Sequence, residues 1–132
     1  MDGTLEVQTG PGVAVIVLRG EHDPSTQPEL QAAIDRAIAA GMSVVVDLSV
    51  VEFIDSTVLS AILHGHKRAT NGEDGREQGL AVVASPGAQV VARMLSLVRV
   101  DDHVGVHLSR DSAVVSLRGT GRRAPRALRA VP

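Results

Sequence analysis

The chain opens with a pattern in which apolar and polar residues alternate, as they do in a strand with one face on a core. Residues 4–8 form such a segment, residues 13–20 form a second extended and largely apolar segment, and the tripeptide Gly10-Pro11-Gly12 lies between them. Proline fixes one backbone dihedral angle and glycine releases another, so this tripeptide is typical of a turn. The pattern predicts a β-hairpin at the start of the chain.

A helical spacing replaces this alternation after the hairpin. The apolar residues that recur at the spacing of one helix face are Leu30, Ile34 and Ile38. Asp23-Pro24 or Ser25 can cap the start of such a helix, and Gly41 suits its end. We therefore expect a helix from about residue 24 to about residue 40.

The segment 44–63 joins a strand pattern to a helix pattern and is the most informative part of the sequence. The valine-rich run 44–48 suits a strand that is buried on both faces and central in its sheet. The apolar stripe of the following helix consists of Val58, Leu59, Ile62 and Leu63. This spacing places Ser56 at a helix N-terminus, where free backbone N–H groups and the helix dipole would tolerate an added phosphate.

The rest of the chain continues to alternate between strands and helices. A loop is predicted at 71–75, strands at 80–84 and 104–108, a helix that opens at 85–87, and a short helix at 111–117. Together these elements predict a single α/β domain. Its mixed sheet should have roughly four to five strands, with helices packed mainly on one face.

Charge divides the chain into a domain and a tail. The formal net charge of the 132 residues is −2, but 118–132 contains five arginines and no acidic residue. Residues 1–117 therefore carry about −7. We expect 1–117 to be the domain and 118–132 a disordered or weakly helical tail, solvated rather than bound to nucleic acid or acidic lipid.

Composition excludes several classes of protein. The chain has no cysteine, which excludes disulfides and thiol catalysis, and Phe53 is its sole aromatic residue, so base-stacking platforms for nucleic acids cannot be built. No basic segment leads into an apolar stretch of signal-peptide type, and no stretch approaches the length that spans a bilayer. We expect a cytoplasmic protein with no membrane contact.

The motifs of common enzymes and metal sites are missing from the sequence. There is no glycine-rich phosphate loop and no G-x-S-x-G nucleophile motif. His64 and His66 point to nearly opposite sides of the predicted helix, and His103 and His107 flank a segment that favours a strand. We therefore expect no catalytic site, no metal and no cofactor.

Two spaced motifs resemble those of a known family. The stretch 44–69, VVVDLSVVEFIDSTVLSAILHGHKRA, resembles the signature of STAS domains, specifically of free-standing anti-sigma-factor antagonists. In these proteins a strand ends in D-L-S and is followed by F-[IM]-D-S-[ST] and a helix. Upstream, the tetrapeptide 20–23, GEHD, resembles the family's G-E-[LI]-D element. The resemblance covers about residues 4–117 and implies a STAS-like fold.

The resemblance implies regulation by partner switching. It places phosphorylation at Ser56, by an anti-sigma factor that is itself a GHKL-type kinase, with Thr57 as the alternative acceptor. The unphosphorylated antagonist would bind the anti-sigma factor, and a PP2C-type phosphatase would reset it. The residues assigned to partner binding are Asp23, Asp55, Ser56, Thr57 and Val58.

Other interpretations of the same residues remain open. Asp55, Ser56 or Asp23 can each serve only to cap a helix. The family commonly has S-[ST]-G-L-G, whereas this chain has Val58 and Ser60 in place of the glycines, so Val58 should add bulk at the contact surface. The alternative function is a non-catalytic STAS scaffold or subunit in a transporter-associated or stressosome-like assembly.

Overall fold

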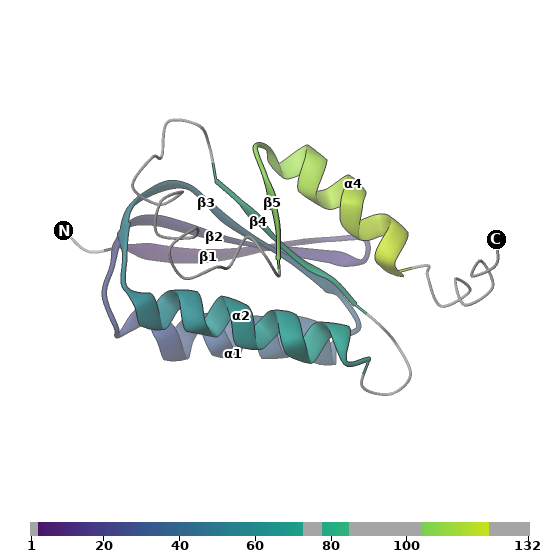
Figure 1. Ribbon diagram of the computed structural model, residues 1–132, viewed down its shortest axis with the longest axis horizontal. Coiled ribbons are helices and arrows are strands. Elements are labelled where there is room, and N and C mark those ends of the chain that lie inside the picture. Colours follow the sequence, from purple (N-terminus) through teal and green to yellow (C-terminus); the bar gives the residue numbers. More distant parts are fainter. Residues whose placement is uncertain (1–2, 73–77, 85–103, 122–132) are drawn as a thin grey trace.

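The computed structural model describes residues 3–72, 78–84 and 104–121, which form one five-stranded sheet with helices on both faces (Figure 1). The strands are β1 (Thr4–Gly10), β2 (Val13–His22), β3 (Ser43–Ile54), β4 (Leu80–Val83) and β5 (Gly105–His107). The helices are α1 (Thr26–Ala39), α2 (Ser56–Thr70) and α4 (Arg110–Gly121). The strand order is β1-β2-β3-β4-β5, with β1 antiparallel to β2 and the other pairs parallel. The predicted mixed α/β fold with a central third strand is confirmed.

The hairpin forms where the sequence predicts it. β1 and β2 pair from Thr4 opposite Arg19 to Gly10 opposite Val13. Gly12 has a φ of +78°, a conformation that glycine adopts without the steric penalty of a side chain. The hairpin puts β1 at one edge of the sheet and passes β2 into its interior.

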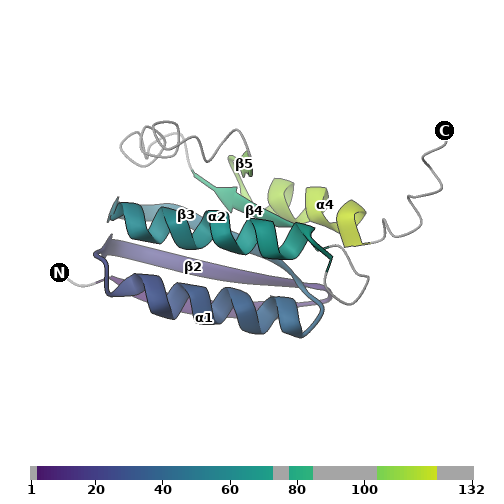
Figure 2. The same ribbon diagram turned by 60° about the horizontal axis from the view of Figure 1, so that its bottom comes forward.

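Helices α1 and α2 lie side by side on one face of the sheet and bury the main core against it (Figure 2). Fully buried side chains of this core include Ile16 and Leu18 from β2 and Ile62 from α2. The two helices are packed tightly at Gly65, where an added Cβ atom would lie 2.7 Å from Cγ2 of Ile34. Glycine is therefore required at this position by packing rather than by backbone conformation.

Helix α4 lies on the opposite face of the sheet and buries a smaller cluster (Figure 1). Its Ala113 and Leu117 pack against Val45 of β3 and Val83 of β4. The helix runs to Gly121, past the end expected at 117, and the sequence has no proline before residue 125 that would interrupt it. The first residues of the predicted disordered tail are therefore helical.

Strand β3 extends beyond the predicted 44–48. The sequence pattern does not indicate its second half, because two β-bulges interrupt the alternation of faces there. Its pairing with β2 skips one extra residue between Asp47 and Val50, and another between Val51 and Phe53. Each bulge breaks the alternation of faces. The core-facing residues of β3 accordingly change from a spacing of two to a spacing of three: Val44, Val46, Leu48, Val51 and Ile54.

Several sequence predictions fall outside the described residues. These are the helix opening at 85–87, most of the loop at 71–75, and residues 122–132 of the Arg-rich tail. Within the described ranges, no helix has the length and apolar character needed to cross a membrane.

Candidate functional site

The junction between β3 and α2 is built around Asp55, which caps the helix. Oδ1 of Asp55 accepts a hydrogen bond from the backbone N–H of Thr57 at 2.8 Å and another from the Thr57 hydroxyl at 2.9 Å. These bonds satisfy one of the free N–H groups at the start of α2. Asp55 is therefore the N-cap residue of α2, which is one of the roles that its sequence position predicts.

Ser56 is the first residue of α2 and is exposed. Its hydroxyl makes no hydrogen bond with any residue in the described part of the chain, whereas the Thr57 hydroxyl donates to Asp55. The two candidate acceptors thus differ in hydrogen bonding, because modification of the Thr57 hydroxyl would first break a bond within the cap. Both residues are exposed, and Ser56 offers the hydroxyl that is not engaged in the cap.

A similar turn precedes α1. Oδ1 of Asp23 accepts from the Ser25 backbone N–H at 2.9 Å and from the Ser25 hydroxyl at 2.5 Å, and the Thr26 N–H donates to the Asp23 carbonyl at 3.0 Å. The hydrogen bonds from the Ser25 hydroxyl and backbone lower the pKa of Asp23. Ser25 itself makes no side-chain cap, so Asp23 is the residue that shapes the entry into α1.

The two turns are adjacent because they follow neighbouring parallel strands. The register pairs His22 with Ile54, and the backbone N–H of Asp55 donates to the His22 carbonyl at 2.9 Å. Both helices therefore start at the same end of the sheet (Figure 1). Asp23 and Ser56 are exposed at this end, beside each other in the topology.

His22 is a buried polar residue beneath this end of the sheet, and sequence reasoning did not single it out. Only 2% of the residue is exposed. Its Nε2 lies 3.0 Å from the Arg19 carbonyl, to which it can only donate, so Nδ1 accepts from the Thr26 hydroxyl at 2.8 Å. The available signal was a histidine where the related motif has Leu or Ile.

Val58 does not lie where the family resemblance placed it. Its side chain is fully buried in the core under α2, so it cannot meet a partner in this conformation. The reason is helical spacing, which sets Val58 on the same inward stripe as Leu59 and Ile62. Ser60, the other departure from the glycine pattern, is exposed.

An ion pair between a buried aspartate and a partly exposed arginine joins β3 to α4 next to the first bulge. Asp47, whose side chain is 4% exposed, accepts from Nε of Arg110 at 2.7 Å and from the backbone and hydroxyl of Ser49 at 2.9 Å and 2.6 Å. Burial raises the pKa of this carboxyl, but the hydrogen bonds from Ser49 and Arg110 outweigh it, so the pKa of Asp47 is lowered. The aspartate of the D-L-S segment therefore has a structural role.

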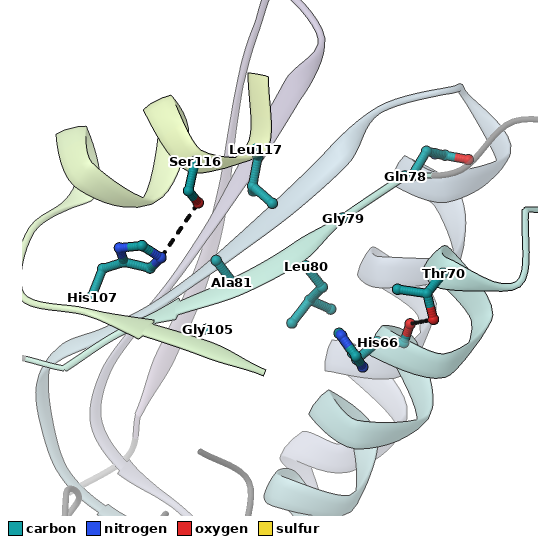
Figure 3. A pocket seen from close by; sticks show the side chains of 10 residues that line it. All are labelled: His66, Thr70, Gln78, Gly79, Leu80, Ala81, Gly105, His107, Ser116 and Leu117. Carbon is teal, nitrogen blue, oxygen red and sulfur yellow. Dashed lines mark hydrogen bonds between the residues drawn. The ribbon is translucent and has the colours of Figure 1, made fainter. Parts of the chain in front are cut away.

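A depression of about 360 Å³ lies at the β4–β5 edge of the sheet, between α2 and α4 (Figure 3). His66 and His107 are among its lining residues. The His107 ring lies 2.8 Å from the Ser112 hydroxyl and 3.3 Å from the Ser116 hydroxyl, so it anchors β5 to α4. Among the described residues, no group of three or more side chains is arranged to hold a metal ion.

Comparison with known protein families decides the class of this domain. The model of the family described as "Mlab, STAS domain" matches residues 5–108. The chain belongs to the STAS-domain family. A search of curated proteins finds no match.

Solved structures of proteins described as anti-sigma factor antagonists share the fold. An anti-sigma factor antagonist from Mycobacterium paratuberculosis is 30% identical, with a TM-score of 0.75 over 89% of this chain and 95% of that one. A provisionally assigned antagonist from Thermotoga maritima is 22% identical, with a TM-score of 0.70 over 86% and 94%.

The antagonist SpoIIAA also shares the fold, and it has been solved in two states. Its unphosphorylated form is 17% identical, with a TM-score of 0.59 over 86% of this chain and 96% of that one. The phosphorylated form, from Bacillus, is 13% identical, with a TM-score of 0.62 over 86% and 98%. At these identities the likeness shows the fold of the STAS domain alone.

Proposed function

We propose that this STAS domain is an anti-sigma-factor antagonist that acts by partner switching. In this scheme it binds its anti-sigma factor, a GHKL-type kinase, while Ser56 is unmodified, and it is released when the kinase phosphorylates Ser56. A PP2C-type phosphatase then restores the binding form. The domain itself performs no catalysis and presents a hydroxyl to the kinase in the cytoplasm.

One observation carries this proposal: Ser56 offers an exposed hydroxyl at the first position of α2, and no residue in the described ranges bonds it. A kinase can approach such a hydroxyl without unfolding the helix or breaking its cap. The product is compatible with the helix as well, since a phosphate at an N-terminus meets free N–H groups and the positive end of the dipole. Similarity to the 30%-identical mycobacterial antagonist supports the same function.

The charges around Ser56 explain why phosphorylation would release a partner. Asp55 lies directly before it, and Asp23 lies on the neighbouring turn. A phosphoserine adds about −1.5 to −2 charge at neutral pH. Within an interface that excludes water, this charge beside two carboxylates is repelled and must also be desolvated, which weakens binding.

The test uses the protein with an anti-sigma factor recovered by co-purification and identified by mass spectrometry. Incubation with ATP should label wild-type protein and Thr57→Ala on Ser56, and should leave Ser56→Ala unlabelled. Ser56→Ala should bind the anti-sigma factor constitutively. Ser56→Glu should bind at least about tenfold more weakly, a loss of about 1.4 kcal/mol or more. Labelling of Thr57, or unchanged binding by Ser56→Glu, would reduce Ser56 to a helix-start residue.

The alternative function is a STAS scaffold or subunit of a transporter-associated or stressosome-like assembly. No feature of the site favours it over the antagonist. Recovery of transporter components or of a large multi-STAS complex in the same co-purification, with no kinase, would identify it.

A further inference from the structure

The sole aromatic residue of the chain lies on the surface. Phe53 is 46% exposed, and Val50, on the same face of β3, is 53% exposed. The bulges of β3 cause this, because they keep Val51 and Ile54 facing the core and turn Val50 and Phe53 to the opposite face. We call Val50 and Phe53 the sheet-face patch.

Helix α4 covers only part of the face that carries this patch. It packs on Val45, Ala81 and Val83 and starts at Arg110, whose side chain pairs with Asp47. The sheet-face patch lies on β3 beyond Asp47, past the start of the helix. The second half of this face therefore exposes apolar side chains next to the end of the sheet where Ser56 lies.

Phe53 also lines a depression of about 510 Å³ around the end of β2. Glu21, Asp23 and Glu29 line the same depression. The side chains of Glu21 and Glu29 make no ion pair or hydrogen bond with any residue that the structure describes. The depression thus combines an exposed aromatic ring with two glutamates, Glu21 and Glu29, whose carboxylates are not bonded to any part of the chain that the structure describes.

We propose that the sheet-face patch and this depression bind an arginine or lysine side chain of the anti-sigma factor, with its aliphatic part on Phe53 and its charge on Glu21 and Glu29. The partner interface then extends from Ser56 around the end of β3 onto the sheet face. This inference rests on the proposed function for the identity of the partner, and it adds Phe53 as an aromatic anchor.

The chemistry of the depression favours a cationic side chain over other occupants. Arginine and lysine have an apolar stem and a charged head, which match a ring beside carboxylates, and a cation near the ring face gains further attraction. A purely apolar side chain would leave the two glutamates without a counter-charge. A second copy of the chain would bring together domains that each carry about −7 in residues 1–117.

Calorimetry with the purified anti-sigma factor that phosphorylates Ser56 tests this inference. Phe53→Ala should bind at least about tenfold more weakly, as expected for an aromatic anchor, and Phe53→Leu should lie between it and wild type. Val115→Ala is the matched control, since Val115 is 69% exposed on α4 and should not affect binding. Glu21→Gln with Glu29→Gln should weaken binding and reduce its dependence on salt.

The outcomes separate this inference from the proposed function. If Ser56→Glu loses binding while Phe53→Ala binds like wild type, the sheet-face patch is not part of the interface and the antagonist function stands. If Phe53→Ala instead converts a dimer to a monomer in sedimentation, the patch binds a second copy and the inference is wrong. Circular dichroism should show the same melting temperature for Phe53→Leu and wild type, which keeps loss of fold apart from loss of contact.

Discussion

Replacing Arg110 with methionine should destabilise the domain more than the same replacement of an arginine in an exposed ion pair. Methionine keeps much of the length and apolar contact of the arginine stem but removes the charge that pairs with Asp47 at 2.7 Å. The Asp47 side chain is 4% exposed, so water can replace the lost partner only in part. The variant leaves a nearly buried carboxylate with only Ser49 as a donor among the described residues.

The magnitude follows from the burial of the two partners. Removing one member of a fully buried pair costs about 3–5 kcal/mol, and an exposed pair contributes about 0–1 kcal/mol. The Arg110 side chain is 38% exposed, which places this pair between the two limits. We expect the free energy of unfolding to fall by about 2–3 kcal/mol, a large part of the stability of a domain of this size.

Urea unfolding followed by far-ultraviolet circular dichroism measures this loss, because the chain has no Trp or Tyr to report by fluorescence. The matched control is Arg19→Met. Arg19 pairs with Glu6 at 2.8 Å, a distance similar to that of the Arg110–Asp47 pair, but the two side chains are 48% and 51% exposed. The control should lose about 0.5 kcal/mol or less.

The pH dependence gives a second readout. The pKa of Asp47 is lowered in the folded protein, so its contribution is present at pH above the unfolded value of about 3.9 and is lost as pH falls through the folded value. Stability of wild type should therefore fall more steeply below about pH 4 than that of Arg110→Met. Equal losses in Arg110→Met and Arg19→Met, or parallel acid profiles, would refute the reasoning.

Three further predictions address the packing and the two turns. Gly65→Ala should lower the free energy of unfolding by about 1 kcal/mol or more, since the new methyl group meets Ile34, and urea titration in an Ile34→Ala background should remove the effect. Asp55→Ala should lose about 1 kcal/mol and speed amide hydrogen exchange at the start of α2, whereas Asp55→Ser should keep the cap. Asp23→Asn keeps the acceptor for Ser25, so its melting temperature should match wild type while calorimetry shows weaker binding to the anti-sigma factor; equal binding would move the interface elsewhere.

The elements that the sequence predicted well depend on local patterns. The hairpin follows from its Pro-Gly turn, and α2 follows from an apolar stripe that begins at Val58. At Val58 two lines of reasoning disagreed, because the family motif placed it on the contact surface and the helical spacing placed it in the core. The structure agrees with the spacing, since a local periodicity reflects this chain's own packing and a motif position reflects other chains.

The features that escaped prediction depend on residues far apart in the sequence. The bulges of β3 arise from its register with β2, which no pattern within β3 encodes. The partner of Asp47 is Arg110, 63 residues later, on a helix whose position requires the whole sheet. The buried ring of His22 bonds a backbone carbonyl and the first residue of α1. These two partners can be identified only once the folded structure is known.

The exposed position of Phe53 makes this domain easy to observe by magnetic resonance. Because the chain has one Phe and no Tyr or Trp, carbon-13 labelling of phenylalanine yields a ring spectrum from a single residue. That residue is three positions before Ser56 and outside the core. Its chemical shifts and ring-flip rate can therefore report the binding of a partner near the junction of β3 and α2 in one sample, with no engineered label and no assignment of the remaining side chains.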